Sequence, residues 1–260
     1  MRIKEVIAAL ELFAPLPLQE SYDNAGLQVG LTGVEEASGA LLCLDVTEEV
    51  LAEAVELGAN LVVAHHPLLF RGLKRLSETT QVERCVRFAV KHDITIYAAH
   101  TNLDNVQGGV NATISDKLGL TDTAFLRPMP SGAGGSGMIG SLAKPESAED
   151  VLRRIKAEFG VECLMHNALL TRPIRRVAVC GGSGAFLLGD AIAAGADLFL
   201  TGEMGYHEYF GHEGLIQIAV IGHYQSEKFT MNLFKNILGD ACPQLPVHIT
   251  RCCTNPISYL

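Results

Sequence analysis

The chain has little of what would direct it to a membrane, to nucleic acid or to an oxidising compartment. Its longest apolar runs have fewer than ten residues, which is too short to span a bilayer. Its net charge is −9 and it has no long basic run, so we do not expect a surface that binds nucleic acid through its phosphates. Its seven cysteines are an odd number and form no Cys-x-x-Cys pair, which favours a reduced, cytoplasmic protein.

The chain also lacks the usual nucleotide-binding fingerprints. Gly181–Gly184 is rich in glycine and stands between an apolar run and an expected helix, but it is not a G-x-G-x-x-G motif and no Walker lysine follows it. Backbone amides of such a segment can bind a phosphate, and a tight strand-to-helix turn explains the glycines equally well. Both interpretations stay open.

What the chain does have is enough apolar sequence for a large core. It has 260 residues, of which 48% are hydrophobic, and this suits one large domain or two α/β lobes. Near its start, Ile3, Val6 and Leu10 recur at helical spacing, while Lys4 and Glu5 interrupt the apolar character. We therefore expect an amphipathic surface helix there and not a signal peptide.

Histidines and carboxylates follow four apolar runs that have the character of strands. The runs and the residues that follow them are Leu61–Ala64 with His65 and His66, Ile94–Ala99 with His100 and Asp104, Leu198–Thr201 with Glu203, and Ile216–Gly222 with His223 and Glu227. In open α/β sheets, binding groups gather beyond the carboxyl ends of the strands. The pattern predicts an α/β fold with one polar site assembled from distant parts of the chain.

Imidazole and carboxylate groups without a cysteine suit zinc, iron, manganese or nickel. Side chains of consecutive residues in an extended chain point to opposite sides, so one ion would not readily bind both His65 and His66. Two ions, with a carboxylate such as Glu227 bridging them, would resolve this. Capping or core packing explains any single histidine as well, but it does not explain a histidine or carboxylate at every one of these ends.

The two halves of the chain share a spacing. Cys43 and Gly58 are as far apart as Cys180 and Gly195, and each glycine opens a similar buried run. This predicts two related βαβ units, in which His66 corresponds to Glu203, His100 to His223 and Asp104 to Glu227. The alternative is that any two βαβ units look alike, because their loops draw on few residue types.

The Pro-, Gly- and Ser-rich segment Arg127–Gly140 is the best candidate for a boundary or a mobile loop. We divide the chain into a first α/β lobe at 1–126, a glycine-rich loop with a small αβ insert at 127–172, and a second α/β lobe at 173–260. The two lobes count as one domain if they share a core. Within this plan, Thr47 is placed to cap a helix over Glu48–Leu57, and Ser147 to cap one over Ala148–Phe159.

Two further groups of polar residues have open roles. Asp45 either faces the site or caps a helix. Arg71, Lys74 and Arg75 follow the first histidine pair and either receive an anionic group of a substrate or lie in a solvated loop.

The motifs together resemble those of the GTP cyclohydrolase 1 type 2 homologue family, also called the NIF-three-like proteins. The segments that carry the resemblance, in chain order, are Ser21–Gly30, Asp45–Thr47, Ala64–Pro67, His100–Asp104, Gly181–Gly184, Thr201–Glu203 and Gly222–His223 with Glu227. The resemblance covers nearly the whole chain. It implies two α/β lobes with mixed sheets and a dinuclear metal site in the cleft between them.

The resemblance also implies roles for residues. The five metal ligands would be His65, His66, Asp104, His223 and Glu227, with Glu227 shared by two divalent ions. The family's motifs place His100 and Glu203 beside the ligands, as second-shell or proton-transfer groups. Family members are typically toroidal homohexamers, and many have an extra domain between the halves. This chain resembles the short form.

The expected function is that of a metal-dependent hydrolase with a small-molecule substrate. The family name records the opening of the GTP imidazole ring, and another nucleotide or a phosphoester is also compatible. The ligand types do not select one metal among zinc, iron, manganese and nickel. The alternative is a metal-binding regulatory or interaction scaffold without turnover.

Overall fold

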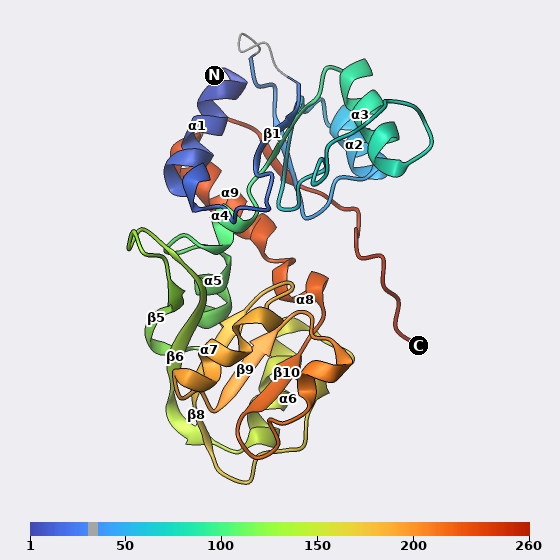
Figure 1. Ribbon diagram of the computed structural model, residues 1–260. Coiled ribbons are helices and arrows are strands. Elements are labelled where there is room, and N and C mark those ends of the chain that lie inside the picture. Colours follow the sequence, from blue (N-terminus) through green and yellow to red (C-terminus); the bar gives the residue numbers. More distant parts are fainter. Residues whose placement is uncertain (31–35) are drawn as a thin grey trace. The chain divides into compact units, whose positions relative to one another are not determined.

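The computed structural model describes residues 1–30 and 36–260, which form two compact units (Figure 1). Unit 1 contains Met1–Leu103 and Phe229–Pro256, and unit 2 contains Asp104–Lys228 and Ile257–Leu260. The chain therefore leaves unit 1 once, builds most of unit 2, and returns. The limits of these units do not coincide with the boundaries drawn from the sequence at 126/127 and 172/173, and that three-part division stays a prediction.

Unit 1 contains a mixed five-stranded sheet in the order β1-β4-β3-β2-β11. Its strands are β1 (Gly26–Val29), β2 (Ala40–Cys43), β3 (Leu61–Ala64), β4 (Thr95–Ala98) and β11 (Val247–Ile249). Strands β11, β2, β3 and β4 are parallel, and β1 runs antiparallel beside β4. The parallel strands end together, which is the arrangement that the polar residues after β3 and β4 require.

The helices of unit 1 pack in pairs, α1 with α9 and α2 with α3 (Figure 1). The elements are α1 (Ile3–Phe13), η1 (Leu16–Leu18), α2 (Glu48–Glu56), α3 (Gln81–Lys91), α4 (Thr101–Asp104, which crosses the unit boundary) and α9 (Thr230–Ala241). Ile3, Val6 and Leu10 are the buried residues of α1, so the predicted amphipathic helix is confirmed.

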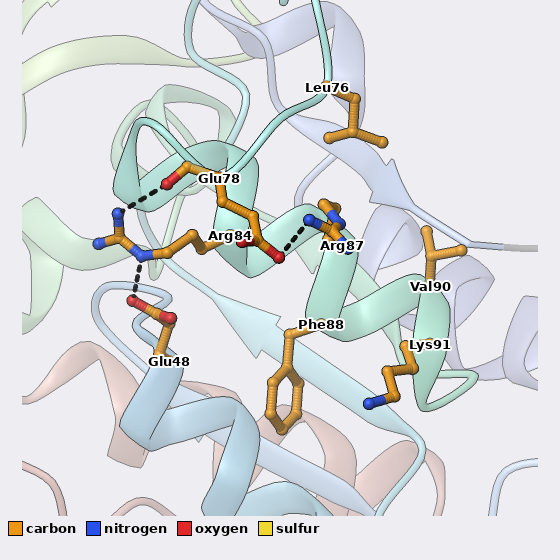
Figure 2. Close-up of a pocket in the computed structure, with 8 residues that line it drawn as sticks. All are labelled: Glu48, Leu76, Glu78, Arg84, Arg87, Phe88, Val90 and Lys91. Carbon is orange, nitrogen blue, oxygen red and sulfur yellow. Dashed lines mark hydrogen bonds and ion pairs between the residues drawn. The ribbon is translucent and has the colours of Figure 1, made fainter.

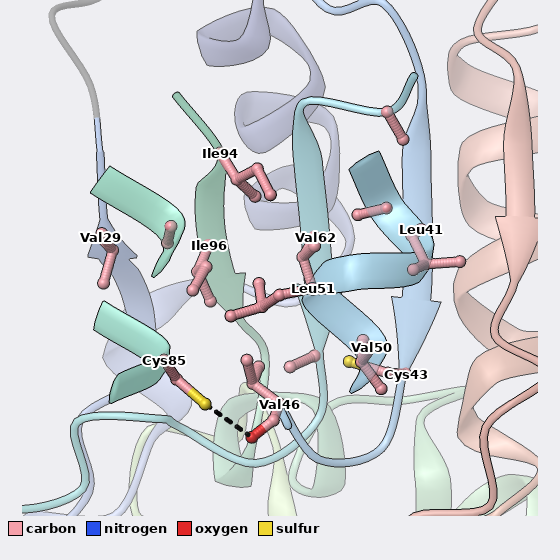
Figure 3. Packing of buried hydrophobic residues seen from close by; sticks show 14 of the residues in the cluster. Val29, Leu41, Cys43, Val46, Val50, Leu51, Val62, Cys85, Ile94 and Ile96 are labelled. Carbon is pink, nitrogen blue, oxygen red and sulfur yellow. Dashed lines mark hydrogen bonds between the residues drawn. The ribbon is translucent and has the colours of Figure 1, made fainter. Parts of the chain in front are cut away.

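The core of unit 1 fills the space between α2, α3 and one face of the sheet (Figure 3). Leu51 of α2 and Cys85 of α3 pack with Val62 and Ile96 of the sheet, and all four are fully buried. A strand with buried residues on both faces is typical of a parallel sheet, and β2, β3 and β4 are buried along their whole length.

Unit 2 contains a mixed six-stranded sheet in the order β5-β6-β8-β9-β10-β7. Its strands are β5 (Thr121–Pro128), β6 (Gly135–Glu146), β7 (Met165–His166), β8 (Ile174–Cys180), β9 (Leu198–Thr201) and β10 (Gln217–Val220). Strands β8, β9 and β10 are parallel, and the other pairs are antiparallel. The segments expected to form a small αβ insert contribute β6 and β7 to this sheet. The segment Arg127–Gly140, expected as a loop, instead forms the end of β5, a turn and the start of β6, because its backbone pairs across the two strands.

The helices of unit 2 cover its sheet and connect its strands. They are α5 (Val110–Lys117), α6 (Ala148–Phe159), η2 (Ala185–Leu187), α7 (Leu188–Ala193), η3 (Tyr206–Tyr209) and α8 (His223–Glu227). Helix α5 contacts β6 and β8, and α7 contacts β5. A buried apolar cluster that includes Phe199, Ile218 and Leu187 joins the sheet to the elements that cover it.

The registers of the two parallel triplets agree with the spacing found in the sequence. In unit 1, Cys43 pairs with Ala64 of β3, which pairs with Ala98 of β4. In unit 2, Cys180 occupies the corresponding place beside Thr201. The third strand differs by one residue, because one more residue separates the end of β10 from His223 than separates the end of β4 from His100.

The α/β class and the two mixed sheets are confirmed. Both predicted helix caps are also present: Thr47 accepts a hydrogen bond from the Val50 N–H, and Ser147 accepts one from the Asp150 N–H. Among the described residues, no helix combines the length and apolar character that crossing a membrane would need.

Candidate metal centre

Three histidines of unit 1 form what we call the histidine cluster: His65, His66 and His100. Each offers one ring nitrogen, and these nitrogens lie within 4.8 Å of one another. Their ring centroids are 4.9 to 5.5 Å apart. His65 is fully buried, and the side chains of His66 and His100 are 21% and 17% exposed. Three imidazoles so close together are a donor set that suits a divalent transition metal.

The Nδ1 atom of each clustered histidine faces an oxygen. His65 Nδ1 lies 2.9 Å from the Ala99 carbonyl oxygen, His66 Nδ1 lies 2.7 Å from Asp45 Oδ1, and His100 Nδ1 lies 2.8 Å from Asp23 Oδ1. Because these oxygens accept hydrogen bonds, they favour the tautomer with the proton on Nδ1. Nε2 then carries the lone pair, and an acceptor behind Nδ1 is the usual support of a histidine that binds metal through Nε2.

His65 and His66 lie side by side, which corrects the expectation that they point to opposite sides. That expectation assumed an extended chain, but β3 ends at Ala64 and both histidines stand in a bend. Their backbone N–H groups donate to two consecutive carbonyls, those of Cys43 and Leu44. An extended strand in a parallel sheet does not donate from consecutive residues to one neighbour, so the alternation of side chains is broken here.

Two carboxylates behind the histidine cluster are held in their charged form. Burial raises the pKa of Asp23, but hydrogen bonds from His100 and Thr101 outweigh it and bring the pKa to about 2. Burial also raises the pKa of Asp45, and the hydrogen bond from His66 with a further one from Thr254 lowers it below its usual value. Both acids are therefore anionic near neutral pH and stabilise the imidazole proton that faces them.

Unit 2 has a second group of candidate ligands, the His223 cluster: Asp104, Glu203, His223 and Glu227. His223 Nδ1 lies 3.0 Å from Glu203 Oε1, and His223 Nε2 lies 3.1 Å from Glu227 Oε2. Asp104 and Glu227 each offer a carboxylate oxygen within 4.8 Å of the other. Two carboxylates thus flank the imidazole and a third, Asp104, lies close to Glu227, which leaves a surplus of negative charge that a cation would balance.

The spacing of His223 and Glu227 suits a shared metal ion. Two ligand atoms at about 2.0 to 2.1 Å from a tetrahedral ion are about 3.3 Å apart. The observed separation of Nε2 and Oε2 is 3.1 Å. Both residues stand on α8, four positions apart, so one helical turn fixes this separation.

The position of Glu227 depends on a glycine. Glu227 is buried, with 4% of its side chain exposed. A Cβ atom on Gly182 would lie 2.4 Å from Glu227 Oε1, and Gly182 has φ +56°, where side chains are strained. Ser226 adds to the contact, because its hydroxyl accepts from the Gly182 N–H and donates to the His223 carbonyl. The glycine turn and α8 are therefore fitted to each other.

The turn Gly181–Gly184 uses its amides inside the protein. The N–H groups of Gly181, Gly182 and Gly184 donate to the side chains of Asn111, Ser226 and Thr201 respectively. A phosphate would have to compete with these bonds. Of the two interpretations left open by the sequence, the structure favours the tight turn.

Sequence reasoning missed the residues that support the clusters. Asp23 was part of a noted motif but had no role, and it orients His100. Asn111 is buried, and it bonds the Asp104 carbonyl and the Gly181 N–H at once. Asp45 had two open roles; it contacts His66, while Thr47 caps α2. Of these supporting residues, only Asp45 gave a usable signal in the sequence, because it is an acidic residue that follows the apolar run of β2.

The structure thus gathers the sequence-predicted site residues into two groups, each within its own unit. His65, His66 and His100 are together in unit 1. Asp104, Glu203, His223 and Glu227 belong to unit 2, where each contacts or neighbours another member. His100 was expected to transfer protons, but one of its ring nitrogens also lies within 4.8 Å of a ring nitrogen of His65 and of His66.

The cations considered as an anion site are not part of either group. Arg71, Lys74 and Arg75 are exposed. A separate pocket of about 660 Å³ lies over α3, and its arginines are already bonded (Figure 2). Arg84 donates to Glu48 and to the Glu78 carbonyl, and Arg87 pairs with the Glu78 carboxylate. This pocket therefore offers little uncompensated positive charge.

Comparison with known proteins identifies the family to which the chain belongs. The family model described as Duf34/NIF3 (NGG1p interacting factor 3) matches residues 1–256. The chain therefore belongs to the Duf34/NIF3 family, and the resemblance noted from its motifs is confirmed.

Individual relatives agree with this assignment. A "GTP cyclohydrolase 1 type 2 homolog" of Clostridium perfringens is 37% identical over 229 residues, 87% of either chain. A protein of the same name from Lactococcus lactis is 37% identical over 238 residues, 88% of either chain. Among solved structures, a hypothetical protein of Staphylococcus aureus, SA1388, has a TM-score of 0.91 and 26% identity, and the match covers 100% of this chain and 99% of the other.

Proposed function

We propose that the protein is a metal-dependent hydrolase that binds two divalent ions through His65, His66, Asp104, His223 and Glu227. In this proposal Glu227 is shared by both ions. The observation that carries it is the histidine cluster, in which every Nδ1 faces an acceptor while the ring nitrogens converge. A buried histidine with a purely structural role also needs a hydrogen-bond partner, but such a role does not explain why three imidazoles converge.

The donor chemistry of unit 2 supports the same proposal. Asp104, Glu203 and Glu227 bring more negative charge than His223 can neutralise, and Glu227 is buried. Buried carboxylates close to one another are stabilised when they coordinate a metal. Zinc, iron, manganese and nickel all accept this mixture of imidazole and carboxylate.

We further propose a nucleotide or phosphoester as the substrate. GTP is the first to test, because the two bacterial relatives carry the name GTP cyclohydrolase 1 type 2 homolog. Hydrolysis adds water across the bond that breaks, with the oxygen going to the electrophilic atom and a proton to the leaving group. For ring opening of GTP the electrophilic atom is C8 of guanine.

The protein's own residues handle the protons in this mechanism. A bound pair of metal ions supplies Lewis acidity and lowers the pKa of water at the site. His100 keeps Nε2 as its basic atom because Asp23 holds the proton of Nδ1. Glu203, whose side chain is 52% exposed, contacts His223 and the Ser183 hydroxyl and passes a proton to the leaving group.

The test begins with elemental analysis of the purified protein, which we expect to give two ions per chain. The metal-loaded protein is then screened for turnover of GTP, other nucleotides and phosphoesters. His66→Ala and Glu227→Ala should abolish turnover while circular dichroism shows a retained fold. His92→Ala and Glu213→Ala are matched controls, because both side chains are exposed and lie outside the two clusters.

The same screen distinguishes the hydrolase from the alternative, a regulatory or interaction scaffold without turnover. Full metal occupancy without turnover of any tested substrate would contradict the hydrolase and favour a regulatory or interaction scaffold. A homohexamer in the cytoplasm is part of the same proposal, and sedimentation of the metal-loaded protein tests the assembly.

A further inference from the structure

A pocket of about 600 Å³ opens beside the His223 cluster, within unit 2. Its lining residues are Met165, Ser183, Ala185, Gly202, Glu203, Met204, Gly205, Glu208, Gly222, His223, Ile257 and Tyr259. Pockets of about 300 to 1,000 Å³ with an apolar wall and a few convergent polar groups are the usual sites of small ligands.

The apolar wall of the pocket is formed by side chains that are exposed to solvent. Met165, Ile257 and Tyr259 are 53%, 53% and 43% exposed, and Met204 also lines the pocket. Methionine and tyrosine favour the face of a planar ring, because a thioether packs against aromatic groups and a phenol stacks on them. The Tyr259 hydroxyl is held by Gln225 Nε2 at 3.2 Å, which fixes the ring at the edge of the pocket.

The charge of the pocket selects its ligand further. Two carboxylates, Glu203 and Glu208, line it, and the described lining residues include no lysine or arginine. Such a pocket repels a phosphate and attracts N–H donors. Glu203 already pairs with His223 and accepts a hydrogen bond from the Ser183 hydroxyl. Glu208 is therefore the carboxylate best placed to accept hydrogen bonds from a ligand.

Glu208 is held in place by its own loop. Its Oε2 accepts a hydrogen bond of 2.6 Å from the Gly205 N–H. A carboxylate has room for further hydrogen bonds, because each of its oxygens has two lone pairs. The local bond therefore fixes the side chain at the pocket without exhausting its capacity to accept.

We propose that this pocket binds a planar, amino-substituted nitrogen heterocycle, with its ring against Met204 and Tyr259 and its N–H groups donated to Glu208. The inference rests on the proposed function, since it assigns the ring of the substrate to a pocket that contains the proposed ligand His223. Glu208 is then a residue that determines specificity. A phosphate tail extends out of the pocket, away from the two carboxylates.

Binding of two nucleosides to the metal-loaded full chain tests the pocket without any need for turnover. Guanosine and inosine differ by the 2-amino group, and neither carries a phosphate. We expect guanosine to bind at least about tenfold more tightly in calorimetric titrations, the effect of one hydrogen bond to a charged group. Equal affinities, or no binding of guanosine at millimolar concentration, would overturn the inference.

Variants locate the effect. Glu208→Gln keeps an acceptor for Gly205, and we expect it to remove most of the preference for guanosine. Met204→Ala should weaken both nucleosides to a similar extent. Glu213→Gln is the matched control on the same loop, since Glu213 is exposed and does not line the pocket. A preference that survives Glu208→Gln overturns the role of Glu208 and with it the proposed orientation.

The two proposals fail in different ways. If guanosine binds with the expected preference and no substrate is hydrolysed, the pocket stands and the hydrolase does not. If nucleotides are hydrolysed but neither Glu208→Gln nor Met204→Ala changes nucleoside affinity, the hydrolase stands and the pocket inference is wrong.

Discussion

The two units differ in how they arrange their candidate metal ligands. In unit 1 the candidate ligands are imidazoles, and ionised carboxylates accept hydrogen bonds from their Nδ1 atoms, as Asp45 does from His66. In unit 2 the carboxylates stand in front, and His223 lies between Glu203 and Glu227. The first arrangement fixes the direction of neutral donors, whereas the second accumulates negative charge. The two clusters therefore differ in their donor chemistry, with oriented neutral imidazoles in unit 1 and negative charge in unit 2.

The largest effect is expected from a substitution that displaces Glu227, one of the carboxylates of unit 2. Gly182→Ala places a methyl group 2.4 Å from the present position of Glu227 Oε1, on a residue with φ +56°. Glu227 must move, so metal affinity should fall by more than about 100-fold, and stability by about 1 to 2 kcal/mol. Calorimetric titration with metal and thermal unfolding measure the two effects.

Gly189→Ala is the matched control for that substitution. A Cβ atom on Gly189 meets nothing within 4 Å, and the residue is in helix α7. Alanine should leave metal binding unchanged and should not reduce stability. If both variants bind metal like the parent protein, Glu227 is not a ligand.

A smaller effect is expected from removing the supports of unit 1. Asp45→Asn weakens the acceptor behind the proposed ligand His66, and loss of such a partner typically lowers metal affinity about 10- to 100-fold. Asp23→Asn weakens the acceptor behind His100, which handles protons in our proposal, so it should lower turnover more than metal affinity. Asp93→Asn, on the surface of the same unit, should change nothing. Unaltered metal affinity in Asp45→Asn would mean that His66 does not bind metal in the proposed way.

Stability against acid tests a carboxylate of unit 1 that lies outside the clusters. Glu53 of α2 is buried, and burial raises its pKa, but hydrogen bonds from Thr250 and Arg251 outweigh this and lower the pKa to about 2 from an ordinary value of 4.5. A lowered pKa means that the contribution of Glu53 to stability is complete above pH 4.5 and is lost as the pH falls through about 2.

Glu53→Gln should therefore destabilise the protein by about 1 to 2 kcal/mol at pH 7. It should also reduce the loss of stability between pH 4.5 and 2, which urea unfolding at several pH values would show. Glu56→Gln on the same helix is the control, because Glu56 is 70% exposed. An unchanged pH dependence in Glu53→Gln would contradict the assigned network.

The smallest effect is expected from the helix caps, which offer one matched test in each unit. Thr47→Ala removes the cap of α2 in unit 1, and Ser147→Ala removes that of α6 in unit 2. Each should lower stability by about 1 kcal/mol and leave metal content unchanged. A loss of metal in either variant would show that the clusters are coupled to helices they do not touch.

Much of the local structure could be predicted from the sequence because its causes are local. Helix α6 begins and ends as the sequence predicts, since Ser147 caps its start and Gly160 takes the left-handed conformation after its end. The polar residues after β3, β4 and β9 were recognised because each follows the end of a buried strand directly or after one residue.

The supports of the site could not be predicted in this way. Asp23 bonds His100, 77 positions away in the chain, and nothing near Asp23 announces that contact. The bend at His65 and His66 depends on consecutive bonds to the neighbouring strand β2, so the rule of alternating side chains failed there. Pairing of distant segments decides both features, and periodicity carries no information about such pairing.

The route of the chain through unit 1 has a consequence for synthesis. Strand β2 receives its neighbour β11 only after all of Asp104–Lys228 has emerged from the ribosome. Until then the nascent sheet has an open backbone edge along Ala40–Cys43, and such edges invite pairing with foreign strands. The arrival of Val247–Ile249 closes that edge, so truncation before Val247 should yield an aggregation-prone product even though β1 to β4 are all present.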